Sequence, residues 1–448
     1  MSGPFGSSPW GYNPSTGFYD YSIDQSVRFS DNHQLDRTAT AGNQSTWTFS
    51  AWIKRSELGT TQYIWTPYYG GDGVNESAFR FTTDNKLNIY DSGASRGQVT
   101  TTAVFRDVGA WMHLVVVLDL TESTAADRVK IYVNGQLQDK TVNNAIGTGV
   151  WGWNANSNTH RLGGYARNTT SNLVGYMAEI NFVDGTALTP STFGETKNGV
   201  WVPKEVSGVT YGTNGFRVDF ADSSDLGNNA NSTDGTNDFT TVTGLTASDV
   251  VLDSPTNNFA TMNYLDNLNW LSQGLSNETY TQGNLQASGT SWMTRCTFRL
   301  DSGKWDWEAR KPANYLSMGI YETDGASNNS NQAYYYYQGS VVDATSSRSS
   351  PTTLYTGTNH ADGTIIGVEF DADNLTLEYY ANGVSFYKIT SLDDAKYTAS
   401  FGTAANTTFQ VNFGQDPTFC DQFSGGDVGT QTDENGNVKK DSGEYILL

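Results

Sequence analysis

Residues 363–389 read GTIIGVEFDADNLTLEYYANGVSFYKI, and this stretch decides the fold. Two runs in it alternate apolar and polar residues with the period of a β-strand. Asn382-Gly383 predicts a two-residue type I′ turn, because both central positions of that turn need a positive φ. Such a turn sets Tyr379 opposite Phe386 on one face of the sheet. The stretch therefore predicts a three-stranded antiparallel meander with one apolar face. The apolar positions of its first two strands are Ile366, Val368, Phe370, Leu375, Leu377 and Tyr379.

The same arrangement occurs earlier in the chain, at residues 113–137. HLVVVLDL is followed by an acidic turn, by RVKIYV, by Asn134-Gly135 and by QL. Two meanders of one design predict two all-β domains of related architecture.

Composition narrows the class of protein. The chain has 448 residues, and 26 Lys+Arg against 47 Asp+Glu give a net charge of −21. This charge argues against nucleic-acid binding, because a phosphate backbone would be repelled. Cys296 and Cys420 do not make a disulfide framework. The sequence shows neither a secretory signal at its start nor an apolar run long enough for a membrane span, so we expect a soluble protein that is made in a cytoplasm and has no membrane insertion.

Residues 1–25 are rich in Gly, Ser and Pro but carry many aromatic side chains. A plain flexible leader would not need them. The segment is either an arm packed on its own domain or an arm that docks into a partner subunit. The candidate docking residues are Phe5, Trp10, Tyr12, Phe18 and Tyr19.

Residues 26–220 contain five motifs in a recognisable order: TFSAWIKR, WMHLVVVLD, KIYVNGQLQ, LGGYAR and LVGYMAEINFVDGTAL. In this order they resemble a laminin G-like, concanavalin A-like domain. The resemblance implies a jelly-roll sandwich of two antiparallel sheets. It also implies that residues 175–180 form the strand that closes the domain.

Residues 221–262 read as a polar connector with isolated apolar anchors. Together with the residues just before them they contain GTNGFRVDFADSSDLG and DSPTNNFATMN, which resemble a segment of marine bacteriophage virion proteins. The resemblance implies a structural protein located in the virion, with other virion proteins as partners.

Residues 263–420 resemble a SPRY domain, again a two-sheet sandwich. The resemblance rests on KWDWE, on the meander with its Asn-Gly turn and on FQVNFG. A long polar insertion between Ile320 and Ile365 departs from the family pattern and is expected to rebuild its ligand-binding loops. Residues 421–448 read as a tail that is either loose or ends in an apolar strand docked on a neighbour.

Catalytic patterns are weak. A glycosidase needs two suitably spaced carboxylates, and Glu179 comes nearest, but Asn181 stands where a matching acid would be wanted. His113 begins an apolar strand and reads as a core or edge residue. We therefore predict no enzyme, no metal site and no cofactor. Calcium stays an alternative, because loop oxygens could bind it. The candidate ligands are Asp72, Asp84, Asp119 and Asp184.

Sugar binding needs flat aromatic faces with a few carboxylates and amides. Two stretches of the sequence, at residues 65–72 and 151–154, offer that mixture. At each, packing of the aromatics beneath a loop is the alternative to ligand contact. Four consecutive tyrosines at 334–337 should place two rings inward and two outward. The candidate ligand-binding residues are Trp65, Tyr68, Tyr69, Asp72, Trp151, Trp153, Asn154, Tyr335 and Tyr337.

The predicted fold class is all-β: two tandem antiparallel jelly-roll sandwiches, one concanavalin A-like and one SPRY-like, with an N-terminal arm. The predicted function is that of a structural bacteriophage virion protein, a fibre or appendage, that binds host-surface glycan or neighbouring subunits. A capsid-decorating protein without a host ligand and a polysaccharide depolymerase are the alternatives. We expect a homo-oligomer, and a trimer on precedent.

Overall fold

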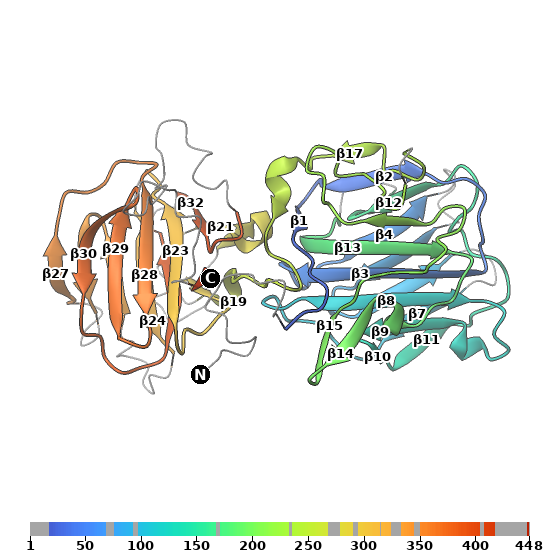
Figure 1. Ribbon diagram of the computed structural model, residues 1–448, viewed down its shortest axis with the longest axis horizontal. Coiled ribbons are helices and arrows are strands. Elements are labelled where there is room, and N and C mark those ends of the chain that lie inside the picture. Colours follow the sequence, from blue (N-terminus) through green and yellow to red (C-terminus); the bar gives the residue numbers. More distant parts are fainter. Residues whose placement is uncertain are drawn as a thin grey trace. The chain divides into compact units, whose positions relative to one another are not determined.

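The computed structural model describes residues 18–68, 76–92, 97–166, 171–232, 235–267, 278–289, 294–313, 315–323, 333–344, 350–403, 407–416 and 446–447. The chain forms two compact units, the first of residues Tyr19–Asn258 and the second beginning at Phe259. Nearly all regular elements are strands (Figure 1). The all-β prediction is therefore confirmed.

Two eight-stranded sheets build the first unit, and we name them after their strands β13 and β5. The β13 sheet has the order β10 (Gln136–Leu137), β9 (Val129–Val133), β8 (Met112–Asp119), β3 (Thr46–Arg55), β13 (Gly175–Asp184), β1 (Ser26–Phe29) and β18 (Val250–Val251), with β16 (Phe216–Val218) also paired to β13. The β5 sheet has the order β11 (Lys140–Asn144), β7 (Gly97–Thr101), β6 (Leu87–Asp91), β5 (Ser77–Phe81), β4 (Gln62–Tyr68), β12 (Thr159–Leu162), β2 (Gln34–Thr38) and β17 (Thr241–Thr243).

Short elements complete this unit. They are the hairpin β14 (Gly194–Lys197) and β15 (Val200–Pro203), and the 3-10 helices η1 (Ala125–Asp127), η2 (Pro190–Thr192) and η3 (Ala247–Asp249).

Aromatic side chains fill the space between the two sheets of the first unit. Trp47, Trp65 and Trp153 have no exposed surface. The ring centroids of Trp65 and Trp153 lie 4.1 Å apart, and those of Trp47 and Trp153 lie 5.2 Å apart. Large rings bury much apolar area, so each of these tryptophans contributes more to the core than a single aliphatic side chain does.

The segment 221–258 belongs to the first unit, which corrects the prediction of a connector at 221–262. Its strand β17 pairs with β2, and its strand β18 pairs with β1. Asp253 accepts a hydrogen bond from the Lys54 ammonium at 2.7 Å and one from Trp111 Nε1 at 2.8 Å. The Lys54 and Asp253 side chains are both fully buried, so the segment is built into the sandwich. The polar composition of this segment is typical of a linker. Its contacts could not be predicted, because the residues that it pairs with lie far away in the sequence.

Two sheets also build the second unit. The seven-stranded sheet has the order β19 (Met262–Asn267), β22 (Thr294–Cys296), β31 (Tyr397–Gly402), β24 (Ser317–Glu322), β25 (Ala333–Tyr337), β26 (Ser340–Asp343) and β27 (Thr352–Thr356). The eight-stranded sheet has the order β20 (Thr279–Thr281), β21 (Gln286–Gly289), β32 (Thr407–Asn412), β23 (Lys304–Arg310), β28 (Ile365–Asp371), β29 (Thr376–Ala381) and β30 (Val384–Ile389), with β33 (Ile446–Leu447) parallel to β23. The 3-10 helix η4 (Gln282–Asn284) lies between β20 and β21.

Strands β28, β29 and β30 form the predicted meander. Asn382 and Gly383 have φ angles of 47° and 74°, as a type I′ turn requires. The predicted pairing of Tyr379 with Phe386 is wrong, because Tyr379 pairs with Tyr387. A register shift next to Tyr379 leaves Phe386 as the extra residue, and the Tyr379 and Phe386 rings still lie 6.2 Å apart.

Two expectations for the second unit need revision. The polar insertion before Ile365 is more than loops, because it supplies β25, β26 and β27 to the seven-stranded sheet. The terminal strand β33 pairs with β23 of its own chain. From the sequence, we expected this segment to be either a loose tail or a strand docked on a neighbouring subunit.

Candidate functional site

The outer face of the β5 sheet gathers charged and aromatic side chains. Along β5 and β6, the core residues alternate with outward ones, as the two-residue period of a strand requires. This alternation turns Arg80 outward from β5 and Tyr90 outward from β6. A register shift in β4 after Tyr63 turns that ring to the same face, while Trp65 stays in the core.

We call Tyr63, Glu76, Arg80, Tyr90 and Tyr165 the tyrosine–arginine cluster. The rings of Tyr63 and Tyr165 stack with centroids 4.4 Å apart. The Glu76 carboxylate accepts hydrogen bonds from the hydroxyls of Tyr90 and Tyr165. The Arg80 guanidinium lies 5.4 Å from the Tyr63 ring centroid and 4.7 Å from that of Tyr90. Each member therefore holds another in place.

Exposure differs within the cluster. Tyr63 and Tyr90 are 7% and 9% exposed, whereas Glu76, Arg80 and Tyr165 are half-buried. Burial, followed by the nearby Tyr63 and the hydrogen bond to Glu76, raises the pKa of Tyr90, so its hydroxyl stays a donor at neutral pH. The cluster thus presents one aromatic ring, one carboxylate and one guanidinium to solvent.

An ion pair extends this face toward β2. Arg161 on β12 donates to both carboxylate oxygens of Asp36, each at 2.7 Å. Arg161 also donates to the backbone carbonyl of Tyr165 at 2.9 Å, which ties the loop that carries this ring to the sheet. The paired geometry fixes both groups more firmly than a single contact would.

The residues that the sequence predicted for sugar contact are not part of the tyrosine–arginine cluster. Trp65, Trp151, Trp153 and Asn154 have no exposed surface, so they pack in the core and cannot meet a ligand from solvent. The Asn154 amide donates to Asn43 O and to Asp184 Oδ1, which makes it a structural crosslink. Tyr68 ends β4, and Tyr69 and Asp72 lie outside the described residues.

The four consecutive tyrosines of β25 alternate as predicted. Tyr334 and Tyr336 are 5% and 0% exposed, whereas Tyr335 and Tyr337 are half-buried. The Tyr337 ring stacks on Tyr315 with centroids 5.8 Å apart. Tyr335 and Tyr337 therefore keep the partial exposure that a contact role needs.

The N-terminal segment is partly built into the first unit. Ile23 is 4% exposed, and its backbone N–H donates to Thr256 Oγ1 while its carbonyl accepts from the same hydroxyl. Of the candidate docking residues, Phe18 and Tyr19 are half-buried. Phe5, Trp10 and Tyr12 fall outside the described residues, so their docking role stays a prediction.

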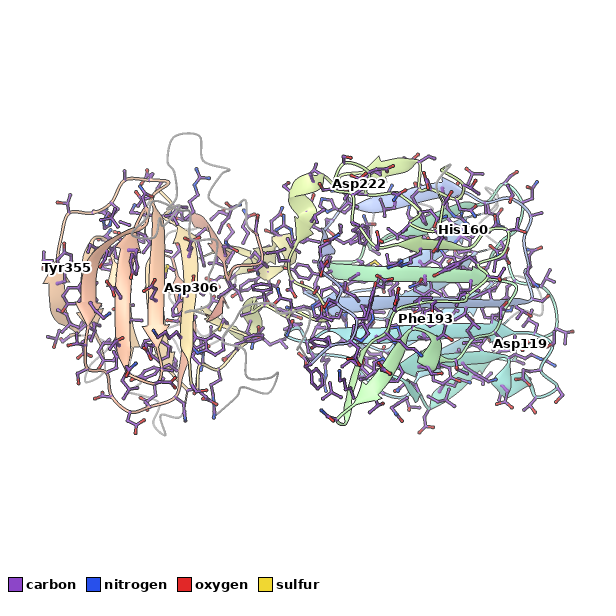
Figure 2. All side chains as sticks on the ribbon, in the orientation of Figure 1. Asp119, His160, Phe193, Asp222, Asp306 and Tyr355 are labelled. Carbon is purple, nitrogen blue, oxygen red and sulfur yellow. The ribbon has the colours of Figure 1, made fainter. Side chains whose placement is uncertain are left out.

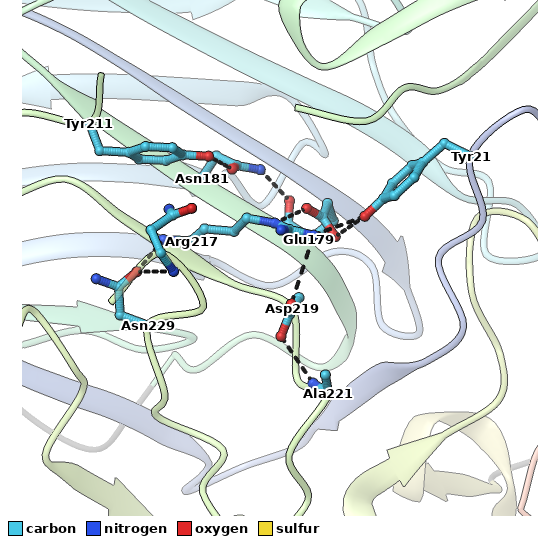
Figure 3. Close-up of polar contacts among 9 residues, drawn as sticks. Tyr21, Glu179, Asn181, Tyr211, Arg217, Asp219, Ala221 and Asn229 are labelled. Atoms are coloured by element: carbon cyan, nitrogen blue, oxygen red, sulfur yellow. Dashed lines mark hydrogen bonds and ion pairs between the residues drawn. The ribbon is translucent and has the colours of Figure 1, made fainter. Parts of the chain in front are cut away.

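Glu179, the nearest match to a catalytic acid, lies on the outer face of the β13 sheet in a second polar group (Figure 3). Its carboxylate is 2.5 Å from Arg217 Nε and accepts a hydrogen bond from Tyr21 at 3.1 Å. Glu179 has a φ of 47° at the register shift between β13 and β3. A non-glycine residue with a positive φ is strained, and the strain must be offset by other interactions. The contacts of Glu179 with Arg217 and Tyr21 offset it here.

Two histidines of the first unit, His113 and His160, are buried in its structure. His113 is 1% exposed, accepts a hydrogen bond from Trp201 Nε1 at Nδ1 and contacts Ser50 Oγ with Nε2 at 2.8 Å. Burial lowers the pKa of His113 to about 3. His160, labelled in Figure 2, is also fully buried and its pKa is lowered by burial. The expectation that His113 is a satisfied core residue is confirmed.

Asp184, one of the candidate calcium ligands, is committed to protein donors. Its carboxylate accepts from the backbone N–H groups of Asn43 at 2.8 Å and Asn214 at 3.0 Å. Asp84 contacts Lys86, and Asp119 caps its own turn by accepting from Thr121. The described part of the chain contains no group of three or more His, Cys, Asp or Glu side chains placed to hold a metal ion. Over the same residues, no helix is long and apolar enough to cross a membrane.

Residues 24–192 match the family model Laminin_G_3, described as the concanavalin A-like lectin/glucanases superfamily. The first unit contains a laminin G-like, concanavalin A-like domain. A search of the curated proteins found no match.

Among solved structures, domains LG4-5 of the mouse laminin alpha1 chain are 11% identical, with 87% of this chain and 88% of that chain covered and a TM-score of 0.32. A SAP-like pentraxin from Limulus polyphemus is 18% identical, with 37% and 78% covered and a TM-score of 0.29. The PSpry domain of TRIM65 is 11% identical, with 34% and 92% covered and a TM-score of 0.27.

The tyrosine–arginine cluster was not predicted from the sequence, although a signal for it exists. The stretch FRFTTDNKLNIYD predicts a hairpin with its turn at residues 84–85, and that register sets Arg80 beside Asn88, with Tyr90 further along the same outer face. The contributions of Tyr63 and Tyr165 could not be found in this way. They depend on the register shift in β4 and on a loop after β12.

Proposed function

We propose that this protein is a non-enzymatic glycan-binding protein, and that the tyrosine–arginine cluster of its laminin G-like domain holds the sugar. One observation carries the proposal. The half-buried Tyr165 donates a hydrogen bond to the Glu76 carboxylate and stacks on Tyr63, and Tyr63 in turn holds the Arg80 guanidinium. Aromatic faces stack on the apolar side of a sugar ring, and preformed polar groups bind its hydroxyls without an ordering cost.

The same geometry supports a binding role over hydrolysis. The Glu179 carboxylate is neutralised by Arg217, so it is poorly suited to protonate a leaving group or to attack a sugar. Release of reducing ends from a bacterial polysaccharide by the purified chain would contradict this part of the proposal.

A glycan array followed by titration calorimetry tests the site. We expect Tyr165→Ala to weaken binding of the selected glycan by about tenfold or more, since one stacking contact is lost. Tyr337→Ala is the matched control, because Tyr337 is another half-buried tyrosine but lies in the second unit. A loss of binding in Tyr337→Ala with no change in Tyr165→Ala would move the site to the second unit.

We further propose that the protein is a structural component of a bacteriophage virion that displays these domains to host-surface glycan. The support is the resemblance of residues 212–227 and 253–263 to virion proteins. Residues 1–17 would then dock onto other virion proteins or onto further copies of the chain, in a homo-oligomer such as a trimer. Light scattering of the purified chain, alone and with particles that lack the protein, would test this role. A monomer that binds no particle would contradict it.

A further inference from the structure

Arg80 differs from Arg161, which also lies on the outer face of the β5 sheet. Arg161 is paired with the Asp36 carboxylate. Arg80 instead donates from Nε to Asn88 Oδ1 at 3.1 Å and from Nη1 to Tyr63 Oη at 2.9 Å, both neutral acceptors. Among the described residues, no carboxylate forms an ion pair with Arg80.

That no described residue gives Arg80 an acidic partner is notable in this chain. Asp and Glu number 47 against 26 Lys and Arg, so acidic partners are abundant. The guanidinium is nevertheless held in one orientation by two tyrosine rings and two hydrogen bonds. Its remaining nitrogen, Nη2, makes no hydrogen bond to the described residues, and the side chain is half-buried at the face. A positive charge fixed in this way, without a carboxylate partner among the described residues, is prepared to bind an anion of a ligand.

We propose that Arg80 binds an oxyanion carried by the sugar, so that the site selects acidic glycans over neutral ones. The oxyanion is a uronate carboxylate or a sulfate ester, and both accept hydrogen bonds from a guanidinium. Tyr165 stacks on Tyr63, and Tyr63 also contacts Arg80. A sugar ring that rests on Tyr165 can therefore direct a substituent toward Arg80. The inference rests on the proposed function, since it names the class of glycan for that site.

The net charge of −21 makes this recognition local. The chain as a whole repels an acidic polysaccharide, so binding must come from a short-range contact and not from a general field. Salt screens this long-range repulsion more than the short-range contact, so affinity for an acidic glycan should not fall as salt is raised.

The experiment is calorimetric titration of the full chain with oligogalacturonate, a sulfated dextran and neutral dextran oligomers of similar length, at low and high salt. We expect one acidic class to bind and Arg80→Gln to weaken it by about tenfold or more, since a charged hydrogen bond is lost. Arg80→Lys keeps the charge but loses the planar fork, and we expect an intermediate loss. Arg299→Gln, at a half-exposed arginine in the second unit, removes the same charge and should change nothing.

The outcomes separate the two claims. Equal binding of neutral and acidic oligomers, with Arg80→Gln unaffected and Tyr165→Ala impaired, overturns the acidic selectivity and leaves glycan binding in place. Loss of binding to neutral and acidic oligomers alike in Arg80→Lys would mean that Arg80 only supports the fold of the cluster, and would also overturn it. Absence of binding to every glycan overturns the proposed function and this inference with it.

Discussion

Burial decides which aromatic residues of the first unit can meet a ligand. Trp153 has no exposed surface and packs against Trp47 and Trp65, whereas Tyr165 is half-buried on the outer face. We expect Trp153→Ala to lower the free energy of unfolding by about 3–5 kcal/mol, because it leaves a cavity in the core. Tyr165→Ala should cost about 1 kcal/mol. Urea unfolding measures both, and equal costs would contradict this assignment.

His113 should make the stability of the first unit depend on pH. Its folded pKa of about 3 lies below the ordinary value of 6.5, because burial disfavours the charged ring. The unfolded chain therefore binds a proton that the folded chain refuses, so the contribution is fully present above pH 6.5 and is lost as pH falls toward 3. Between pH 6.5 and 4.5 the loss in the free energy of unfolding should be roughly 2 kcal/mol.

The matched variant for this pH dependence is His113→Gln, which keeps a polar side chain that does not titrate. Urea unfolding at several pH values should give it a flatter profile than the unchanged chain over this interval. Parallel profiles for the two chains would show that His113 does not carry the effect.

Turns depend on local geometry, and two glycines allow a controlled test. Gly135 has a φ of 76°, and a methyl group there would lie 2.4 Å from the Trp201 ring. Gly59 has a φ of 79° but open space around it. We expect Gly59→Ala to cost about 1–2 kcal/mol from backbone strain alone, and Gly135→Ala to cost clearly more. If thermal unfolding shows equal losses, the contact between Trp201 and the turn is not important.

The segment 221–258 can be tested through its buried ion pair. Asp253→Ala leaves the Lys54 ammonium without its carboxylate, and removing one partner of such a pair costs about 3–5 kcal/mol. Asp225→Ala, in an exposed turn of the same segment, should leave stability unchanged. Chemical unfolding that finds Asp253→Ala as stable as the original chain would favour the connector that composition alone suggested.

Patterns within a short stretch of sequence predicted strands and turns well. Contacts between residues far apart in the sequence could not be predicted from such patterns. The Asn-Gly turns and both meanders follow from residues within one short stretch, so they could be predicted. GVWGWNANSN reads as a surface loop, yet Trp151 and Trp153 are buried because strands far away in the sequence pack over them. The pairing of β17 with β2 also joins residues that no short window contains. The tyrosine–arginine cluster was missed for the same reason.

At the scale of the molecule, the boundary of the N-terminal arm matters for any truncation. Deleting residues 1–25 also removes Tyr21, which bonds to Glu179, and Ile23, which is buried. We expect that deletion to destabilise the first unit by about 2 kcal/mol or more, because a buried Ile side chain alone contributes that much. Deleting only residues 1–17 should leave stability unchanged.

Light scattering and thermal unfolding of both truncations separate assembly from stability. If residues 1–17 dock onto another copy, both truncated chains are monomers but only the longer deletion is less stable. An oligomer that survives the shorter deletion would show that the contact lies elsewhere in the chain.

Glycan binding at the outer face of the β5 sheet is the proposal on which the others depend. The most direct measurement is a crystal structure of the full chain with an oligosaccharide that it binds in solution. We predict electron density for a sugar ring against Tyr165, with an acidic substituent beside Arg80. Density at Tyr335 and Tyr337 instead, with the tyrosine–arginine cluster empty, would contradict the account.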